Sequence, residues 1–295
     1  MSNSINIQKI LTRKIPGIQH DANVVPCVFP GFTQAKATDY WDALTVANGG
    51  IEVDGALYGI TTCALKNAID LWFNSIISGY NITIVYPYIG GTAATHAINA
   101  WNPGIRSLTF YGGVAHTAQG CVYNGTGHAD VGIIPSTIFS NLNYCVSGKT
   151  LNTTSGQITG CTDAPGHADT AQFLYTGTSL RSILYSSYAP ICDDSSSIIT
   201  LAAANGFNIT QRETATEMSV YQNGLLLAHN PTASAYCGTI PSVHTLFIGA
   251  NNLVGLPSNH LTGTLAFNHF GKKIQPADIN NFTTATNTLM ATLGR

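Results

Sequence analysis

Two glutamates, Glu213 and Glu217, are the residues of this chain that come closest to a catalytic pair. Side chains two positions apart share one face of a β-strand, so Glu213, Ala215 and Glu217 would lie in a row. A retaining glycosidase needs two carboxyl groups about 5 Å apart, and strand-borne sites of this kind place a third acid between them. Alanine at the middle position leaves a nucleophile unsupported. A polar strand edge explains the pair more simply, and we expect no enzymatic activity.

The nine histidines are the next candidates, as metal ligands. None shows the HxH, HxxxH or HExxH spacing that aims two imidazoles at one ion. A Gly-His-Ala-Asp tetrapeptide occurs at 127–130 and 166–169 and could bring nitrogen and oxygen ligands to adjacent loops, although such short matches also arise by chance. Asp193-Asp194, followed by three serines, could help to hold calcium, and an Asp/Ser turn explains it equally well. We therefore expect no metal, no cofactor and no catalytic residue.

Nucleophile and phosphate-binding motifs are missing. There is no GxSxG elbow, and Gly90-Gly91-Thr92 lacks the lysine of a P-loop. The seven cysteines are odd in number and form no CxxC or CxxxC pair. We expect that no cysteine pair is oxidised and that the chain folds in a reducing cytosol. The apolar run 24–32 is short and broken by prolines, so no signal peptide is expected.

The composition excludes several classes of protein. Charged residues make up only 9% of the 295 residues, 44% are hydrophobic, and the formal net charge is -2. Such a chain lacks the basic stripe of a nucleic-acid reader and the high charge of a disordered protein. Lys66 and Asp70 interrupt its longest helical apolar stretch, so no membrane span is expected.

Periodicity predicts helices at both ends of a β-rich chain. The first is a short helix around 39–44, and a second begins near Asp54 with apolar residues at steps of three and four up to Ile76. A last helix begins at Pro276 and runs to Leu293. Between them, Gln222-Asn223-Gly224 is a strong type I′ hairpin signal. Twelve short runs rich in Val, Ile, Tyr, Phe and Thr predict strands, and their density predicts a sandwich: 82–88, 108–111, 121–123, 143–146, 172–175, 180–185, 198–201, 207–211, 218–221, 225–228, 245–249 and 265–270.

This pattern divides the chain into three parts. Residues 1–36 are broken by three prolines and read as an extended attachment arm. Residues 37–104 form a helical hairpin and connector, and residues 105–295 form the sandwich with its closing helix. The arm cannot bury enough apolar surface to offset its own ordering entropy, so we expect it to order on a partner. A frayed terminus is the alternative.

Four segments carry a resemblance to a known family. They are the YPYIGGTAATH segment (86–96), the YNGTGHADVG segment (123–132), the Tyr221–Gly224 hairpin and the final Leu293-Gly294-Arg295. Together they resemble tailed-bacteriophage virion proteins with a concanavalin A-like, laminin-G-like jelly roll, over residues 38–295. The resemblance implies a mainly β jelly-roll sandwich and a structural component of the phage particle, such as a head fibre, a decoration protein or a tail-associated protein.

The resemblance sets the functional expectations. The main one is a virion component, assembled in the host bacterial cytoplasm, that docks on capsid or tail proteins through residues 1–36 as a homo-oligomer, with a trimer as the favoured state. The alternative is a carbohydrate-binding adhesin for a host surface glycan, and a glycan hydrolase is the third reading. No nucleic-acid or membrane partner is expected. Tyrosines and asparagines could line a glycan site, and the tyrosines concerned are Tyr111, Tyr123, Tyr144, Tyr175, Tyr185, Tyr188 and Tyr221.

Overall fold

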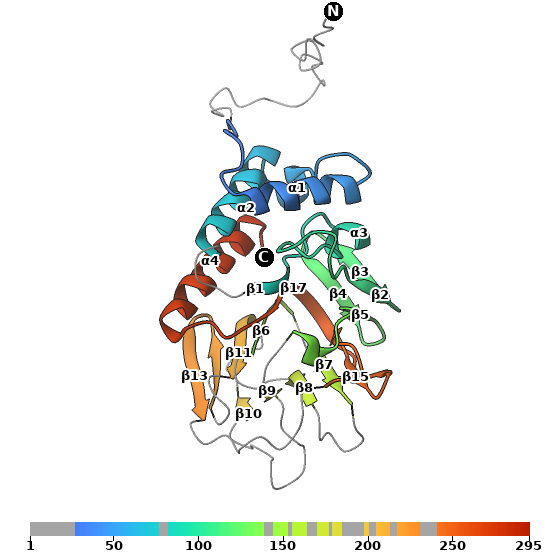
Figure 1. Cartoon of the computed structure of the whole chain (residues 1–295). Coiled ribbons are helices and arrows are strands. Elements are labelled where there is room, and N and C mark those ends of the chain that lie inside the picture. Colours follow the sequence, from blue (N-terminus) through green and yellow to red (C-terminus); the bar gives the residue numbers. More distant parts are fainter. Residues whose placement is uncertain are drawn as a thin grey trace, which may run out of the picture.

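A computed structural model of the chain describes ten stretches of residues: 27–76, 82–138, 144–152, 155–163, 170–176, 179–184, 198–200, 205–212, 217–230 and 241–295. Everything below concerns these residues. Figure 1 shows helices gathered at one end of an antiparallel β-structure. The predicted mainly β sandwich, with an N-terminal helical hairpin and a C-terminal helix, is confirmed.

Three long helices frame one side of the sheet. Helix α1 spans Ala35–Ala47, α2 spans Thr62–Ile76 and α4 spans Ile279–Thr292. The second helix begins eight residues later than the periodicity predicted. The Asp54 side chain accepts a hydrogen bond from the Ala56 N–H and so caps a separate 3-10 turn, Gly55–Tyr58. Gly59, at φ 70°, then ends this turn in a left-handed conformation that favours glycine, so the chain re-enters a helix only at Thr62.

The strands form two layers. One layer has the order β1-β17-β6-β11-β12-β13, with β4 and β3 joined to the first half of β17. The other has the order β2-β5-β14-β7-β8-β9-β10. β15 pairs with β7 in parallel and with β16 in antiparallel fashion. The bounds are β1 Ile82–Tyr86, β2 Thr109–Tyr111, β3 Val114–Thr117, β4 Gly120–Asn124, β5 His128–Asp130, β6 Tyr144–Thr150, β7 Ser155–Thr162, β8 Thr170–Thr176, β9 Ser179–Leu184, β10 Ile198–Thr200, β11 Gly206–Arg212, β12 Met218–Gln222, β13 Leu225–Asn230, β14 Phe247–Ile248, β15 Asn251–Leu253, β16 Leu256–Ser258 and β17 Thr262–Gly271.

Strand β17 is the common partner of the first layer. Along its ten residues it pairs with β4 at one end, with β1 at the other, and with β6 along its second half. Its first residue, Thr262, also pairs with Ser155 of β7, which links the two layers. Because β1 lies in segment 37–104, the sheet takes a strand from outside the predicted range 105–295. The β12–β13 hairpin has its predicted turn, with positive φ at Asn223 and Gly224.

Alternation along the strands creates two cores. On β6, Val146 points into the core between the layers, whereas Cys145 points toward the helices. On β17, Phe270 points into the core between the layers, whereas Phe267 points toward the helices. Trp72 of α2 makes an edge contact with Phe267, with ring centroids 6.1 Å apart. The helices therefore cover the outer face of a sheet whose inner face forms the sandwich core (Figure 1).

A disulfide between Cys27 and Cys63 corrects the expectation that every cysteine is reduced. The two Cα atoms lie 5.9 Å apart although 36 residues separate them in the sequence. No local motif marks such a pair, because the fold alone brings the residues before α1 beside the start of α2. Cysteine usage therefore no longer argues for a reducing compartment. Among the described residues, Cys121, Cys145 and Cys161 are buried thiols.

The residues just before α1 are also held by Asp70 of α2. Its carboxylate accepts hydrogen bonds from the Thr33 N–H at 2.9 Å, the Thr33 hydroxyl at 2.7 Å and the Gln34 N–H at 3.2 Å. The last ten residues of the predicted arm are thus held by the chain itself: residues 27–34 pack on the helical hairpin, and Ala35 and Lys36 already belong to α1. Residues 1–26 lie outside the described part of the chain.

No helix in the described stretches is both long and apolar enough to cross a membrane.

Candidate functional site

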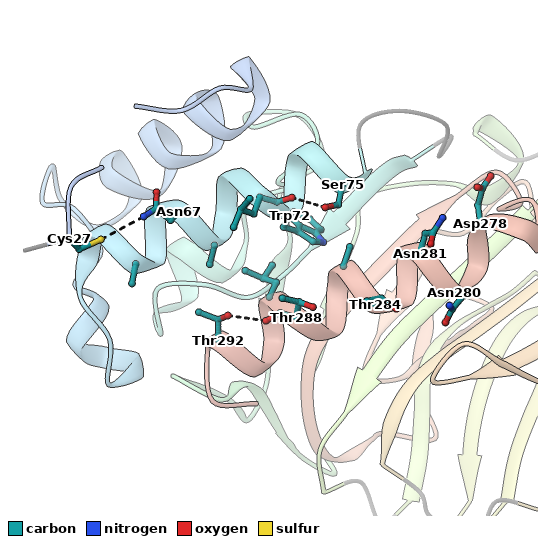
Figure 2. Close-up of a pocket in the computed structure, with 15 residues that line it drawn as sticks. Cys27, Asn67, Trp72, Ser75, Asp278, Asn280, Asn281, Thr284, Thr288 and Thr292 are labelled. Atoms are coloured by element: carbon teal, nitrogen blue, oxygen red, sulfur yellow. Dashed lines mark hydrogen bonds between the residues drawn. The ribbon is translucent and has the colours of Figure 1, made fainter. Parts of the chain in front are cut away.

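A groove with a volume of about 950 Å³ lies between α2 and α4. Figure 2 shows the two helices running side by side in opposite directions, with Asn67 and Thr292 toward one end and Ser75 and Asn280 toward the other. Ala68, Leu71, Ala285 and Leu289 give the groove an apolar floor, to which the buried Trp72 contributes. The groove arises because Trp72 and Thr286 hold the helices together at their inner faces, through a 3.4 Å hydrogen bond from the indole N–H to the threonine hydroxyl.

Neutral amides and hydroxyls form the rim of this groove. Asn281, Thr284 and Thr288 are exposed and recur at steps of three and four along one face of α4. Within the described stretches, their side chains have no hydrogen-bond partner. On the α2 side, the Ser75 hydroxyl donates to the Leu71 carbonyl at 2.8 Å, which leaves its oxygen lone pairs available. Asp278 is the one ionisable residue of the described lining, because Cys27 is in a disulfide and has no thiol to ionise. The groove can therefore accept and donate neutral hydrogen bonds above an apolar base.

A second cavity, of about 470 Å³, lies beside the β12–β13 hairpin and contains Glu217. Ser219 and Tyr221 line it from the same strand face, as the two-residue period of β12 requires. Opposite Ser219 in the register stands His229, and its Nδ1 lies 3.0 Å from the Ser219 hydroxyl oxygen. Lys273 and Gln275 close the cavity from the segment before α4. Of the two glutamates singled out in the sequence, Glu217 lies in this cavity, whereas Glu213 lies outside the described residues together with Ala215.

The other residues considered from the sequence are not brought into one site. His128 stacks between Tyr111 and Phe247, and its neighbour Asp130 accepts a hydrogen bond from the Gly132 N–H at 2.8 Å. The second tetrapeptide copy, 166–169, and the Asp/Ser run, 193–197, lie outside the described residues. Of the seven tyrosines, Tyr123 and Tyr221 are buried, and Tyr111 is 48% exposed. The side chains of Tyr144, Tyr175, Tyr185 and Tyr188 are not among those described.

Two of the segments that carry the family resemblance, 86–96 and 293–295, contact each other. Arg295, in the last segment, donates to the carbonyl oxygens of Pro87 and Tyr88 in the first, at 3.0 and 2.8 Å. Within the first segment, the Tyr88 hydroxyl donates to Asn268 Oδ1 at 2.8 Å. A side chain on Gly90, at φ 108°, would collide with Thr95. These residues hold the helices, β1 and β17 together, so their demonstrable role is structural.

Sequence reasoning missed a cluster formed by His96, His116 and Cys121. The residues come from the short helix α3 (Ala93–His96), from β3 and from β4. Their spacings of 20 and 5 residues match no metal-binding motif, and only the pairing of β3 with β4 places His116 directly opposite Cys121.

Comparisons with known proteins give structural similarity only. No family model matches the chain, and no curated protein sequence does. Domain 4 of AbnA, a GH43 extracellular arabinanase from Geobacillus stearothermophilus, solved in complex with arabinotriose, is 12% identical and aligns over 70% of this chain and 100% of that one, with a TM-score of 0.48.

Two sialidase structures are similar to about the same degree. The CBM40 of the Ruminococcus gnavus IT-sialidase is 16% identical, covers 56% of this chain and 94% of that one, and gives a TM-score of 0.40. The Trypanosoma rangeli sialidase, in complex with sialic acid, is 14% identical over 76% of this chain, with a TM-score of 0.49. The match spans 39% of that sialidase. Similarity at this level concerns the fold and carries no function over to this chain.

Proposed function

We propose that this protein binds neutral carbohydrate in the groove between α2 and α4 and performs no chemistry on it. The observation that carries the proposal is the composition of the groove: an apolar floor under a rim of amides and hydroxyls, in a volume of about 950 Å³. Ligand sites of this size combine mostly apolar walls with a few placed polar groups. This function is that of a carbohydrate-binding adhesin, and its binding site lies on the helices rather than on the sandwich.

A sugar ring fits such a surface for a physical reason. Its C–H faces are apolar and can cover Leu71, which is 66% exposed, and Ala68 beside it. Its hydroxyls both donate and accept hydrogen bonds, as do the side chains of Asn281 and Thr284. An anionic sugar would meet Asp278 without a matching cation among the described lining residues, so the groove selects neutral glycans.

The second cavity differs in its described lining from the site of a glycosidase. Glycosidases place two carboxyl groups around the scissile bond. Around the β12–β13 cavity, Glu217 supplies the one carboxylate of the described lining. Lys273 and His229 line the same cavity, so its described lining is mixed in charge.

Replacing both Asn281 and Thr284 by alanine is expected to weaken binding of a neutral oligosaccharide about 10- to 100-fold, because two hydrogen bonds worth roughly 1 kcal/mol each are lost. Both residues are exposed, so the free energy of unfolding should change by no more than about 0.5 kcal/mol. A glycan array on the full chain identifies the ligand, and calorimetric titration measures the affinity.

Glu217→Gln, in the other cavity, is the matched control and should bind as the unmodified chain does. Binding restricted to anionic glycans would contradict the proposal. So would a loss of affinity in Glu217→Gln with none in the double variant, since the ligand would then occupy the β12–β13 cavity.

For its biological setting, we propose that the protein is a component of a tailed-phage particle, attached through its N-terminal arm as a homo-oligomer, as the resemblance implies. One structural observation favours this setting. The Cys27–Cys63 disulfide and the Thr33–Asp70 hydrogen bonds fix the last part of the arm, residues 27–34, to α2, so a load on residues 1–26 would be transmitted to the folded domain. Several arms per particle site would turn weak docking into stable retention.

Deletion of residues 1–26 tests the setting and leaves Cys27 and its disulfide in place. The truncated chain should melt at the same temperature as the full chain, because the described packing is untouched, and it should be absent from purified particles. Incorporation of the truncated protein at the level of the full chain would refute attachment through the arm.

A further inference from the structure

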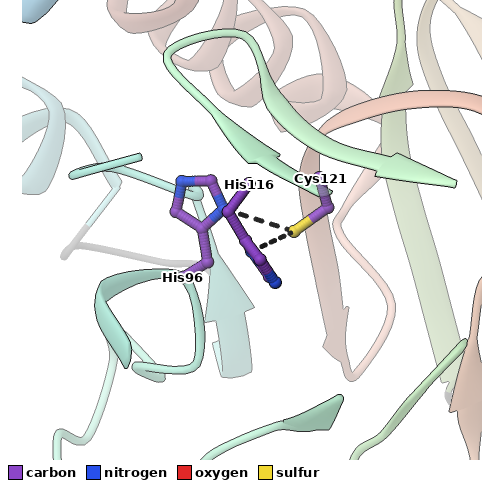
Figure 3. A group of neighbouring side chains, drawn as sticks. All are labelled: His96, His116 and Cys121. Atoms are coloured by element: carbon purple, nitrogen blue, oxygen red, sulfur yellow. Dashed lines mark hydrogen bonds between the residues drawn. The ribbon is translucent and has the colours of Figure 1, made fainter. Parts of the chain in front are cut away.

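The cluster of His96, His116 and Cys121 has the arrangement of a metal-binding site (Figure 3). The Nδ1 atoms of the two histidines lie 3.2 Å apart. Cys121 Sγ lies 3.4 Å from His96 Nδ1 and 3.8 Å from His116 Nδ1. Three donor atoms thus form a nearly equilateral triangle whose members come from three different elements.

The size of this triangle matches metal coordination. With metal–nitrogen bonds of about 2.0–2.1 Å and metal–sulfur bonds of about 2.3 Å, neighbouring donors in a tetrahedral site lie roughly 3.3–3.6 Å apart. One ion can therefore contact all three atoms with only small side-chain adjustments, and in the plane of the triangle it would lie about 2 Å from each. Two imidazoles and a thiolate form a soft donor set, suited to copper and zinc.

We propose that His96, His116 and Cys121 bind a single thiophilic d10 metal ion, Cu(I) or Zn(II), through His96 Nδ1, His116 Nδ1 and Cys121 Sγ. His96 and Cys121 are fully buried, whereas His116 is partly exposed and provides the route from solvent. Nothing in the proposed glycan function uses this cluster, so the two stand independently.

The protonation states of the metal-free cluster suit this role. Burial, together with the charge of Arg295 and the neighbouring His116, lowers the pKa of His96 to about 2, so its imidazole is neutral at physiological pH. Burial also lowers the pKa of His116 and raises that of the Cys121 thiol. Binding an ion therefore displaces the thiol proton, one per ion, and the thiolate contributes the negative charge that offsets the metal. With Cu(I) the site becomes formally neutral, and with Zn(II) it keeps one positive charge.

One contact has to change when the ion binds. The Gly91 N–H donates to His96 Nε2 at 3.1 Å, so the neutral ring carries its proton on Nδ1. A ring that binds metal through Nδ1 carries the proton on Nε2 instead and needs an acceptor there. Gly90 and Gly91 have φ angles of 108° and 71°, a region open to glycine, so the peptide between them can rotate and present the Gly90 carbonyl. The glycine pair thus allows the proton on His96 to move from Nδ1 to Nε2.

The test is titration of the full chain with Cu(I) under anaerobic conditions and with Zn(II), each against a chromophoric chelator. Co(II) serves as a separate spectroscopic probe, because a cobalt–thiolate bond gives a charge-transfer band in the near ultraviolet. We expect one ion per chain, release of one proton per ion, and a melting temperature raised by bound metal. The two titrations show which ion binds more tightly.

Two variants assign the ligands. Cys121→Ser should abolish the cobalt–thiolate band and weaken binding at least 100-fold, and His116→Ala, at the partly exposed position, should weaken it at least 10-fold with less risk to folding. Cys161→Ser, at a buried thiol that donates to the His244 carbonyl, is the control and should bind as the full chain does. The absence of saturable binding in the unmodified chain, or an unchanged band in folded Cys121→Ser, would overturn the proposal.

Discussion

Replacing Arg295 by alanine is expected to lower the free energy of unfolding by about 3–5 kcal/mol, because several buried carbonyl oxygens lose their donor together. The guanidinium donates to the carbonyls of Ala118 at 2.7 Å, Pro87 at 3.0 Å, Tyr88 at 2.8 Å and Ala266 at 3.2 Å. These carbonyls belong to three different segments of the chain, since Pro87 and Tyr88 are consecutive. Loss of Arg295 therefore removes the group that joins α4 to β17 and to the segment after β1.

No carboxylate in the described part of the chain contacts Arg295. The dipoles of these carbonyls therefore stabilise its charge. Burial lowers its pKa, yet the group remains protonated at any physiological pH. Chemical denaturation followed by fluorescence measures the effect. Arg295→Lys should recover only a minor part of the loss, since a single ammonium cannot reach the acceptors that the planar fork serves. The exposed Lys272→Ala should change stability by no more than about 0.5 kcal/mol. A change below 1 kcal/mol in Arg295→Ala would show that water replaces the guanidinium.

Removal of the Cys27–Cys63 disulfide, by the double change Cys27→Ser and Cys63→Ser, is expected to lower the free energy of unfolding by about 2–4 kcal/mol. The cross-link spans 36 residues, so its loss gives the unfolded chain the conformational freedom of a long loop. The Asp70 hydrogen bonds to Thr33 and Gln34 remain, and the folded state should keep α1 in place.

Reductant supplies the internal control for this prediction. It should destabilise the unmodified chain by the same amount as the double substitution and leave the double variant unchanged. Counting reactive thiols in the denatured, unreduced protein checks the premise directly. Modification of Cys27 or Cys63 without reductant would show that the pair is not oxidised.

Most of the strands were predictable because their signals are local. Short apolar runs separated by glycine and asparagine marked twelve of them, and the Asn223-Gly224 pair marked the hairpin turn. Five strands were not predicted: β3, β5, β7, β15 and β16. Four of them have four residues or fewer, whereas β7, Ser155–Thr162, contains two glycines and buries Gln157 and Thr159 in place of an apolar row. Polar residues in an interior position carry no periodic signal.

The candidate sites were not predictable because each depends on contacts between distant residues. The apolar stripes of α2 and α4 are readable one by one, but the groove exists only because two helices about 200 residues apart pack together. The disulfide joins Cys27 to the start of α2, a pairing that only the folded helical hairpin reveals. His96 and His116 meet because the turn around Gly90 and Gly91 directs α3 toward β3, and neither residue has a recognisable spacing.

The position of β17 in the chain has a consequence for how the protein is made. Its residues 262–271 leave the ribosome after β1, β4 and β6, yet all three strands pair with it. During synthesis those strands are present for many seconds without their partner, at about 5–20 residues added per second. Their unpaired edges are templates for wrong pairing in that interval. Folding of the sheet therefore has to wait until β17 has been synthesised, and nascent chains that stop before residue 262 should depend on chaperones to remain soluble.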